Sequence, residues 1–254
     1  MSLLEARNIT KRFGGLEALT DIALTIERGE IYGLIGPNGA GKTTFFNVLT
    51  GFYQADGGDF LFDGAPLDIT TAHEVAAAGI ARTFQNIRLF GNMTALENVM
   101  VGRHVRTRAG VVGAVLRMQS ARDEERAIHA CALDLLEYVG VGARQHDLAN
   151  SLPYGDQRRL EIARALATEP KLLALDEPAA GMNATETATL KRLLERIRAD
   201  GTTILLIEHD VKLVMGLCDR VAVLDYGRKI AEGAPAVVQR DAVVIEAYLG
   251  GALA

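Results

Sequence analysis

Residues 36–43, with the sequence GPNGAGKT, have the spacing of glycine, lysine and hydroxyl residues that suits phosphate binding. Glycines let backbone amides approach phosphate oxygens, because no Cβ atom blocks the way. The helix expected next adds the positive end of its dipole. Lys42 would contact the β- and γ-phosphates, and the Thr43 hydroxyl would bind Mg²⁺. A glycine-rich turn that binds nothing is the alternative, which the strand predicted before the motif disfavours. The motif predicts a nucleoside triphosphate site with contacts from Asn38, Gly39, Ala40, Gly41, Lys42, Thr43 and Thr44.

Two acidic residues end an apolar segment farther along the chain. In KLLALDEP, four apolar residues precede Asp176 and Glu177. Ligands of open parallel sheets bind at the C-terminal ends of the strands. Asp176 is therefore expected to orient Mg²⁺, and Glu177 to polarise the attacking water as a general base. A buried strand ending in Asp-Glu also occurs by chance, so this interpretation depends on the phosphate-binding motif upstream.

Two further polar residues follow short apolar segments. His209 ends TILLIEH, at the sheet edge expected to hold Asp176, and a contact with the γ-phosphate is predicted for it. The alternative is a structural or surface histidine. Gln85 follows the strand-like residues of ARTFQN. A glutamine in a loop carries no meaning alone, and only the order of the motifs draws attention to it.

Composition excludes several classes of protein. The chain has 254 residues, of which 49% are apolar and 23% charged, as in a globular protein with a substantial core. A net charge of −5 argues against nucleic acid as a partner. Cys131 and Cys218 have no metal-binding spacing, which fits a reducing compartment. We expect no signal peptide, because the N-terminal residues MSLLEARNITKRF lack an apolar segment, and no membrane span, because the apolar stretch at 110–116 is far too short.

The elements that must position these residues follow from periodicity and turn residues. Strands are predicted over 23–27, 31–36, 59–64, 172–177 and 203–209, with a hairpin over 220–233 that turns at Tyr226–Gly227. Helices are predicted over 42–49, 94–102, 121–139, 156–168 and 184–199, and a short helix closes the chain. Continuous Leu and Ile runs indicate parallel strands that are covered on both faces. The fold class is therefore α/β, with a mostly parallel sheet interrupted by a helical insertion near 86–165.

Five motifs now stand in one order: GPNGAGKTT, TFQN, LPYGDQRRLEIARAL, LLALDEP and IEHD. In this combination the chain resembles the ATP-binding-cassette (ABC) family of ATPases over about residues 3–235. The resemblance implies ATP and Mg²⁺, and a single nucleotide-binding domain over 1–254. That domain would join a P-loop core and an N-terminal antiparallel β subdomain (1–85 and 166–237) to an α-helical subdomain (about 86–165) and a C-terminal helix (about 238–254).

The resemblance also assigns roles to single residues. Phe13, in KRFGG, matches the aromatic residue that stacks on adenine. Gln85 matches the glutamine that links Mg²⁺ and the attacking water to the membrane partner. Residues 180–183 match the loop that contacts the second subunit; the family usually has Asp where this chain has Asn183.

Longer segments, such as RTFQNIRLFGNMTALENVMVGRH, look like the ATPase subunit of branched-chain amino acid importers. Importers of urea or amides are close alternatives. So is the ATPase of lipopolysaccharide export, which lacks a stretch like 103–126. The resemblance implies a homo- or heterodimer of ATPase subunits on two transmembrane permease subunits, fed by a periplasmic binding protein. The chain would lie at the cytoplasmic face of the membrane as a peripheral subunit.

The turn at 152–156, LPYGD, replaces the family's Leu-Ser-Gly-Gly-Gln, which contacts the γ-phosphate bound by the opposite subunit. Pro153 removes a hydroxyl and an N–H donor, although its fixed φ suits a first helical turn. Tyr154 and Gly155 keep their amides. Asp156 is expected to point away from phosphate and to cap the helix or pair with Arg158 or Arg159. We interpret the stretch as a working variant; a degenerate turn in an inactive subunit is the alternative.

Contact with the membrane subunits is predicted just after Gln85, at Arg88, Leu89 and Phe90, and residues 103–126 could widen it. The alternative for both is helical-domain core or a solvated helix face. The tail VVIEAYLGG is either a docking helix or a packed end.

Three other classes are less consistent with the sequence. Cassette ATPases of DNA repair carry long coiled coils, and no heptad-rich span is present. Translation-associated cassette proteins carry two cassettes, whereas 254 residues hold one. Glu177 and His209 disfavour a regulator that binds nucleotide without hydrolysing it.

Overall fold

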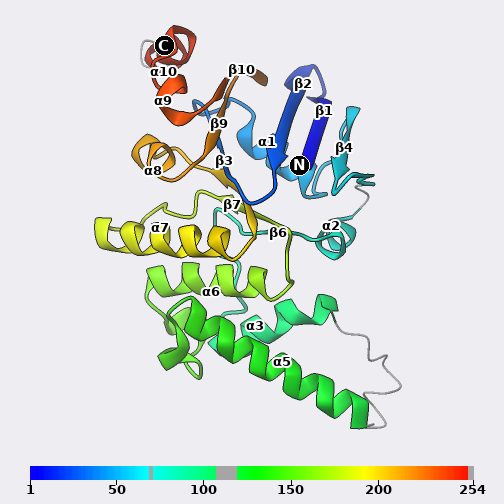
Figure 1. Cartoon of the computed structure of the whole chain (residues 1–254), viewed down its shortest axis with the longest axis vertical. Helices are drawn as coiled ribbons and strands as arrows, with labels where there is room; N and C mark the ends of the chain where they lie inside the picture. The colour runs from blue at the N-terminus through cyan, green and yellow to red at the C-terminus, as the bar shows by residue number, and fades with distance from the viewer. Residues whose placement is uncertain (69–70, 107–118, 251–254) are drawn as a thin grey trace.

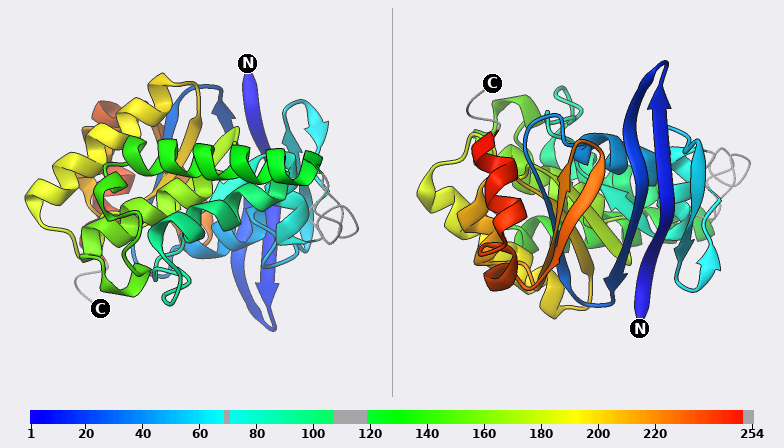
Figure 2. Two further views of the ribbon diagram at one scale, coloured as in Figure 1. Left: turned by 90° about the horizontal axis from the view of Figure 1, so that it is seen from below. Right: turned by 90° about the horizontal axis from the view of Figure 1, so that it is seen from above.

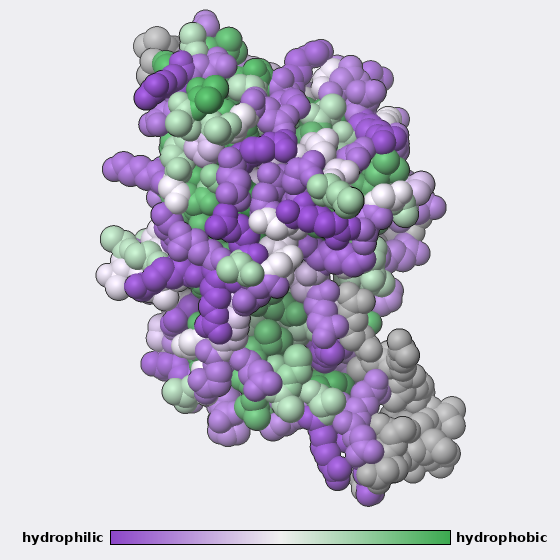
Figure 3. Space-filling model, viewed as in Figure 1, coloured by the Kyte–Doolittle hydropathy of each residue, from purple (hydrophilic) through white to green (hydrophobic). Residues whose placement is uncertain are grey.

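The computed structural model describes residues 1–68, 71–106 and 119–250 (Figure 1). Two sheets form its upper part in Figure 1, and a group of helices forms the lower part. Within the described residues, no helix combines the length and the apolar character needed to cross a bilayer. The face drawn in Figure 3 is mostly polar, with apolar residues gathered over the lower helices and near the C-terminal helix.

The first sheet is antiparallel, in the order β2-β1-β4-β5. Its strands are β1 (Ser2–Phe13), β2 (Leu16–Glu27), β4 (Gly57–Phe62) and β5 (Ala65–Pro66). One face is covered, because alternate residues of β2 such as Ile22, Leu24 and Ile26 are buried. The predicted N-terminal antiparallel β structure is confirmed, with β1 and β2 longer than the alternation alone indicated.

The second sheet has the order β10-β9-β3-β8-β7-β6, and only β10 runs antiparallel to its neighbour. Its strands are β3 (Ile31–Ile35), β6 (Ile80–Arg82), β7 (Leu172–Asp176), β8 (Thr203–Ile207), β9 (Arg220–Asp225) and β10 (Arg228–Gly233). Every residue of β3, β7 and β8 is buried, which explains their continuous apolar runs.

Two hydrophobic cores cover the two faces of this sheet. On β8, Ile204 and Leu206 pack into one core, and Leu205 and Ile207 pack into the other. The latter core fills the space between the two sheets and around α1 (Lys42–Leu49). The former joins the sheet to the helices below, α3 (Ala95–Arg103), α5 (Gln119–Tyr138), α6 (Tyr154–Leu166) and α7 (Ala184–Ala199).

The remaining elements are short. They are α2 (Ala72–Ala78), α8 (Val211–Met215), α9 (Pro235–Val238), α10 (Ala242–Gly250) and the 3₁₀ turns η1 (His104–Arg106), η2 (Gly142–Arg144) and η3 (Ala149–Ser151). Seen from above, the β9–β10 hairpin lies between the strands β1 and β2 and the helix α10 (Figure 2). Val244 of α10 is buried, so this helix packs on its own chain, in agreement with the packed-end alternative for the tail.

Most predicted elements are confirmed, and the differences have local causes. The predicted helices over 42–49 and 184–199 match α1 and α7, and Thr94 caps α3 through a capping box. The helix predicted over 156–168 instead spans 154–166. It begins earlier because Pro153 lies at the N-cap, not in the first turn, and its carbonyl accepts from the amides of Asp156 and Gln157. Helix α2 was not predicted, and two helices rather than one close the described chain.

Candidate nucleotide site

The phosphate-binding motif forms the loop between β3 and α1, where strict steric limits apply. Gly36 and Gly41 have φ values of 151° and 100°. A Cβ atom would lie 2.1 Å from the Leu224 carbonyl at the first position and 2.8 Å from the Ala18 carbonyl at the second. Only glycine fits such positions, since side chains disfavour this backbone region and the neighbouring atoms are backbone. The loop is therefore held in shape by packing against β9 and β2.

Lys42 lies at the first position of α1 and is only 7% exposed. Its ammonium donates hydrogen bonds to the carbonyl oxygens of Gly36 and Pro37, at 2.7 and 2.9 Å. Burial lowers the pKa of this ammonium, and the nearby carboxylates of Glu177 and Asp176 oppose that shift. The Lys42 ammonium thus lies within the loop at 36–43, where the phosphate groups of a nucleotide would bind.

A cleft of about 470 Å³ opens over this loop. The sequence-predicted residues that line it are Phe13, Asn38, Gly39, Ala40, Gly41, Lys42, Thr43, Thr44, Gln85 and Glu177. Its volume lies within the range of small-molecule sites, roughly 300–1,000 Å³. The start of β2 and the turn after β9 complete its rim, and sequence reasoning had assigned none of their residues to the site: Leu16, Glu17, Ala18, Tyr226 and Gly227.

Phe13 presents an exposed ring at the edge of this cleft. The ring makes an edge-to-face contact with Tyr53, with centroids 5.2 Å apart, and Lys11 lies 5.4 Å from its centroid. Tyr53 supports the ring from a distant part of the chain, and no sequence pattern linked the two residues. The arrangement offers a flat aromatic surface on which a base can stack.

Asp176 and Glu177 stand at the carboxyl end of β7, as predicted. Asp176 is 3% exposed, and burial raises its pKa to about 6, while Arg82 opposes the shift. Glu177 has a φ of 47°, a conformation that few non-glycine residues adopt and that often marks a functional position. Its backbone N–H bonds to the Ile207 carbonyl at 2.9 Å, which fixes the turn beside β8.

Three of the predicted catalytic side chains converge on one another. Gln85 donates its amide hydrogen to Oε2 of Glu177 at 2.8 Å. Nδ1 of His209 lies 3.7 Å from the same oxygen, and the histidine ring is exposed. Residues 85, 177 and 209 therefore meet at the carboxyl edge of the sheet, where His209 was expected to lie beside the end of β7.

The donor set fits Mg²⁺ held jointly with a nucleotide. Mg²⁺ prefers oxygen ligands, keeps several waters, and is usually bound by one or two carboxylates together with substrate phosphates. Thr43, Gln85 and Asp176 offer a hydroxyl, an amide oxygen and one carboxylate. Within the described residues, no cluster of three His, Cys, Asp or Glu side chains could hold a metal ion without such help.

Glu208 is a buried acid that sequence reasoning missed. It is fully buried, and its carboxylate accepts the backbone N–H groups of Ala179, at 2.9 Å, and His209, at 3.2 Å. Burial raises its pKa. Glu208 therefore ties the loop after Glu177 to the loop that carries His209. A charged residue at the end of an otherwise apolar strand was the signal that could have revealed it.

The turn at 152–156 lies outside the cleft. Asp156 pairs with Arg159, and with Nε of Arg144 at 3.1 Å, so one of the two predicted pairings is confirmed. Arg158 instead points at backbone carbonyls. A Cβ atom at Gly155 would lie 2.8 Å from a carboxylate oxygen of Glu186, so the helices α6 and α7 approach closely here. Tyr154, Gly155 and Asp156 are thus kept away from the nucleotide cleft of their own chain.

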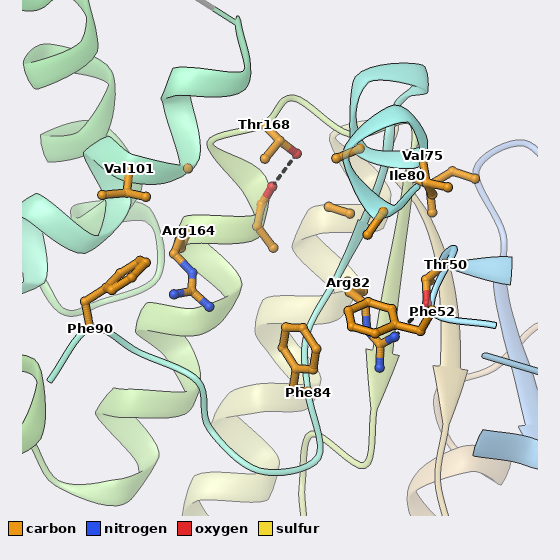
Figure 4. Close-up of a pocket in the computed structure, with 15 residues that line it drawn as sticks. Thr50, Phe52, Val75, Ile80, Arg82, Phe84, Phe90, Val101, Arg164 and Thr168 are labelled. Atoms are coloured by element: carbon orange, nitrogen blue, oxygen red, sulfur yellow. Dashed lines mark hydrogen bonds between the residues drawn. The ribbon is translucent and has the colours of Figure 1, made fainter. Parts of the chain in front are cut away.

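A second cavity, of about 310 Å³, forms a groove between α2 and β6 on one side and α3 and α6 on the other (Figure 4). The guanidinium of Arg82 lies 4.5 Å from the ring centroids of Phe46, Phe52 and Phe84. Phe90 is 47% exposed on the opposite wall, with Arg164 5.7 Å from its ring. The groove is therefore aromatic and cationic. Within the predicted contact at 103–126, residues 107–118 lie outside the described residues.

Comparisons with known proteins agree with this geometry. A family model described as ABC transporter matches residues 19–180. Another, described as branched-chain amino acid ATP-binding cassette transporter, matches residues 228–254. The chain is 44% identical to the high-affinity branched-chain amino acid transport ATP-binding protein BraF of Pseudomonas aeruginosa, over 98% of both chains. It is 45% identical to the LivG protein of Escherichia coli K12, which carries the same description, also over 98% of both.

Solved structures share the fold. The ADP conformation of an ATP-binding cassette of an ABC transporter aligns with a TM-score of 0.86 at 32% identity, covering 98% of this chain and 99% of that one. A dimeric bacterial ABC transporter cassette aligns with a TM-score of 0.77 at 25% identity, covering 91% and 98%. Because the first family model matches more than half of the sequence and relatives above 40% identity span nearly all of it, this chain belongs to the ABC transporter family.

Proposed function

We propose that the chain is the ATP-hydrolysing subunit of an importer of branched-chain amino acids. The observation that carries the reaction is the convergence of Gln85, Glu177 and His209 beside the phosphate-binding loop. The main support for the identity of the solute comes from the comparisons. Relatives named for branched-chain amino acid transport match 98% of the chain, and a family model with the same description matches residues 228–254.

In the proposed site, ATP stacks its adenine on Phe13 and places its phosphates in the loop at 38–44. Thr43, Asp176 and Gln85 would hold Mg²⁺, which when bound would neutralise charge on the phosphates. Glu177 accepts a proton from the attacking water, which Gln85 helps to orient from its position 2.8 Å from that carboxylate. His209, whose Nδ1 lies 3.7 Å from Oε2 of Glu177, would contact the γ-phosphate.

Each subunit supplies only part of a site in this proposal. The turn at 152–156 does not line the cleft of its own chain, and in this proposal it contacts the nucleotide of a second subunit. The amides of Tyr154 and Gly155, at the positive end of α6, would face the γ-phosphate, while the charge of Asp156 is neutralised by Arg144 and Arg159. The existence of a dimeric cassette with the same fold supports this arrangement.

The groove around Arg82 and Phe90 is proposed to receive the permease subunits. Phe84, the chain neighbour of Gln85, lines it, so a segment bound in it lies close to a residue of the proposed reaction centre. Its aromatic walls and its two arginines suit a short helix with apolar and acidic residues. The chain would then lie at the cytoplasmic face of the membrane, with two permease subunits above it and a periplasmic binding protein beyond them.

Uptake by cells tests the solute. The gene is expressed in a bacterium that lacks its own branched-chain amino acid ATPases, together with candidate permease and binding-protein genes from the same genome. Leucine uptake should be restored by the wild-type chain and not by Glu177→Gln. Restoration of urea uptake alone, or of lipopolysaccharide export, would instead support one of the alternative transporters.

A further inference from the structure

A buried ion pair on α6 takes no part in the chemistry proposed above. Arg158 is 3% exposed and Glu161 is 1% exposed, and their closest nitrogen and oxygen atoms lie 3.4 Å apart. Burial raises the pKa of Glu161. Ions in such a place are costly unless hydrogen bonds satisfy their remaining donors and acceptors. The partners of this pair are therefore informative, and they lie mainly in the loop that carries Gln85.

Both sides of that loop are fastened to α6. Arg158 donates to the carbonyl oxygen of Phe84 at 2.7 Å and to the carbonyl oxygen of Gln85. Glu161 accepts the backbone N–H of Phe84 at 3.3 Å and that of Arg88 at 3.4 Å. The backbone on either side of Gln85 is thus held by two charged side chains of one helix. Gln85 is expected to follow α6 when that helix moves.

Tyr154 extends this network to a third segment. Its hydroxyl oxygen accepts hydrogen bonds from Arg158, at 2.9 Å from Nη2 and 3.2 Å from Nε. Its hydroxyl hydrogen is donated to the carbonyl oxygen of Ala180 at 2.9 Å. The ring also packs on Gly181, where a Cβ atom would lie 3.3 Å from it. Residues 180 and 181 belong to the loop between Glu177 and α7. One phenol therefore joins the turn at 152–156, the Gln85 loop and the loop after Glu177.

The links of this network differ in strength. The bonds of Arg158 and Glu161 are charge-assisted and buried, so they hold α6 and the Gln85 loop together as a unit. The bond from Tyr154 to Ala180 joins neutral groups at an exposed position. The unit also meets the segment after β7 through the Tyr154 ring on Gly181 and through the bond from Gln85 to Glu177. The bond from Tyr154 to Ala180 helps to set the position of the unit relative to that loop.

We infer that Tyr154 is a positioning residue for hydrolysis. Its hydroxyl aligns the turn presented to the opposite subunit with the Gln85–Glu177 pair of its own site, so that the two half-sites are assembled in register. The inference rests on the proposed function, because it needs a nucleotide site that two subunits share. Tyr154 acts through Arg158 and Gln85 and makes no contact with the phosphate through its side chain.

The test is Tyr154→Phe in the full-length chain, assembled with its permease subunits in lipid nanodiscs. The variant keeps the ring on Gly181 and removes only the hydroxyl. We expect kcat for ATP to fall by about 10-fold or more, because the hydroxyl makes one neutral hydrogen bond to Ala180 and accepts charge-assisted hydrogen bonds from Arg158. KM for ATP should not change, since Phe13 and the loop at 38–44 remain intact. A matched control is Tyr138→Phe, which removes a hydroxyl bonded to Asp200 at 2.5 Å, in part of the chain that does not line the cleft.

A double variant separates positioning from general stability. If Tyr154 acts through Gln85, then Gln85→Ala with Tyr154→Phe should have the same kcat as Gln85→Ala alone. Unchanged kcat in Tyr154→Phe, an equal loss in Tyr138→Phe, a changed KM, or additive losses in the double variant would each overturn the inference while leaving the proposed function intact. A wild-type assembly without ATPase activity would overturn the proposed function and the inference together.

Discussion

Asn183 stands where the family usually has Asp, and in the structure it caps a helix. It is the N-cap of α7, and its side-chain oxygen accepts the backbone N–H groups of Thr185, at 2.9 Å, and Glu186, at 3.0 Å. Glu186 returns the contact by accepting the N–H of Asn183 at 2.9 Å. The same Glu186 carboxylate lies against Gly155 in the turn at 152–156. Loss of the cap should therefore weaken both the helix and its packing on that turn.

The expected loss of stability follows from the hydrogen bonds that Asn183 makes. Asn183→Ala leaves the first amides of α7 without their side-chain acceptor, which costs about 1 kcal/mol at an exposed N-cap. In a chain of this size that change lowers the melting temperature by about 2–4 °C. Thermal unfolding of the nucleotide-free chain, followed by circular dichroism, measures it.

Asn183→Asp is the matched control. The carboxylate keeps the acceptor and adds a negative charge at the positive end of α7, which is favourable. Its melting temperature should equal or exceed that of the wild type. The reasoning is refuted if Asp destabilises the chain as much as Ala does, or if Ala has no effect.

Three further expectations concern the site and its groove. Glu177→Gln should reduce hydrolysis by about 100-fold or more and trap an ATP-bound dimer on a sizing column; normal turnover would rule out this base. The pKa of Asp176 is about 6 in the folded chain and 3.8 in the unfolded chain, so the folded chain keeps this proton to higher pH. The free energy of unfolding should therefore fall by about 3 kcal/mol as the pH rises between those values, because the buried carboxyl becomes charged. Asp176→Asn should flatten that slope in urea titrations at pH 4–8, and an unchanged slope would contradict the assignment. Phe90→Ala should abolish stimulation of the ATPase by permeases and leave basal activity unchanged, whereas the exposed Val237→Ala should alter neither; equal stimulation of both variants would place the permease elsewhere.

Local chemistry made much of the fold predictable. Helix α1 follows a glycine-rich loop, α3 and α7 begin at capping residues, and the hairpin turns at Tyr226 and Gly227, which both have positive φ. Each of these signals is contained in a few neighbouring residues. The proximity of His209 to the end of β7 was also predictable, because the carboxyl ends of parallel strands share one edge, whereas only the order of the motifs drew attention to Gln85.

Other features depend on residues that are distant in sequence. The bonds from Arg158 to the Gln85 loop, the contact of Phe13 with Tyr53 and the ring of phenylalanines around Arg82 all span such separations. Hydrophobic periodicity could not predict these contacts, because each forms only when two or more elements have packed together. The division of the chain into core, β and helical subdomains at the proposed boundaries stays a prediction, as do the roles assigned to single site residues.

The central claim is that one chain holds only half of each working site. The most direct measurement is the ATPase rate per chain of the purified protein across a wide range of concentration, with mass photometry of the same samples. The account predicts that the rate per chain rises with the dimer fraction, or is absent until a sister subunit is added. Full activity in a species that remains monomeric at every concentration would contradict it.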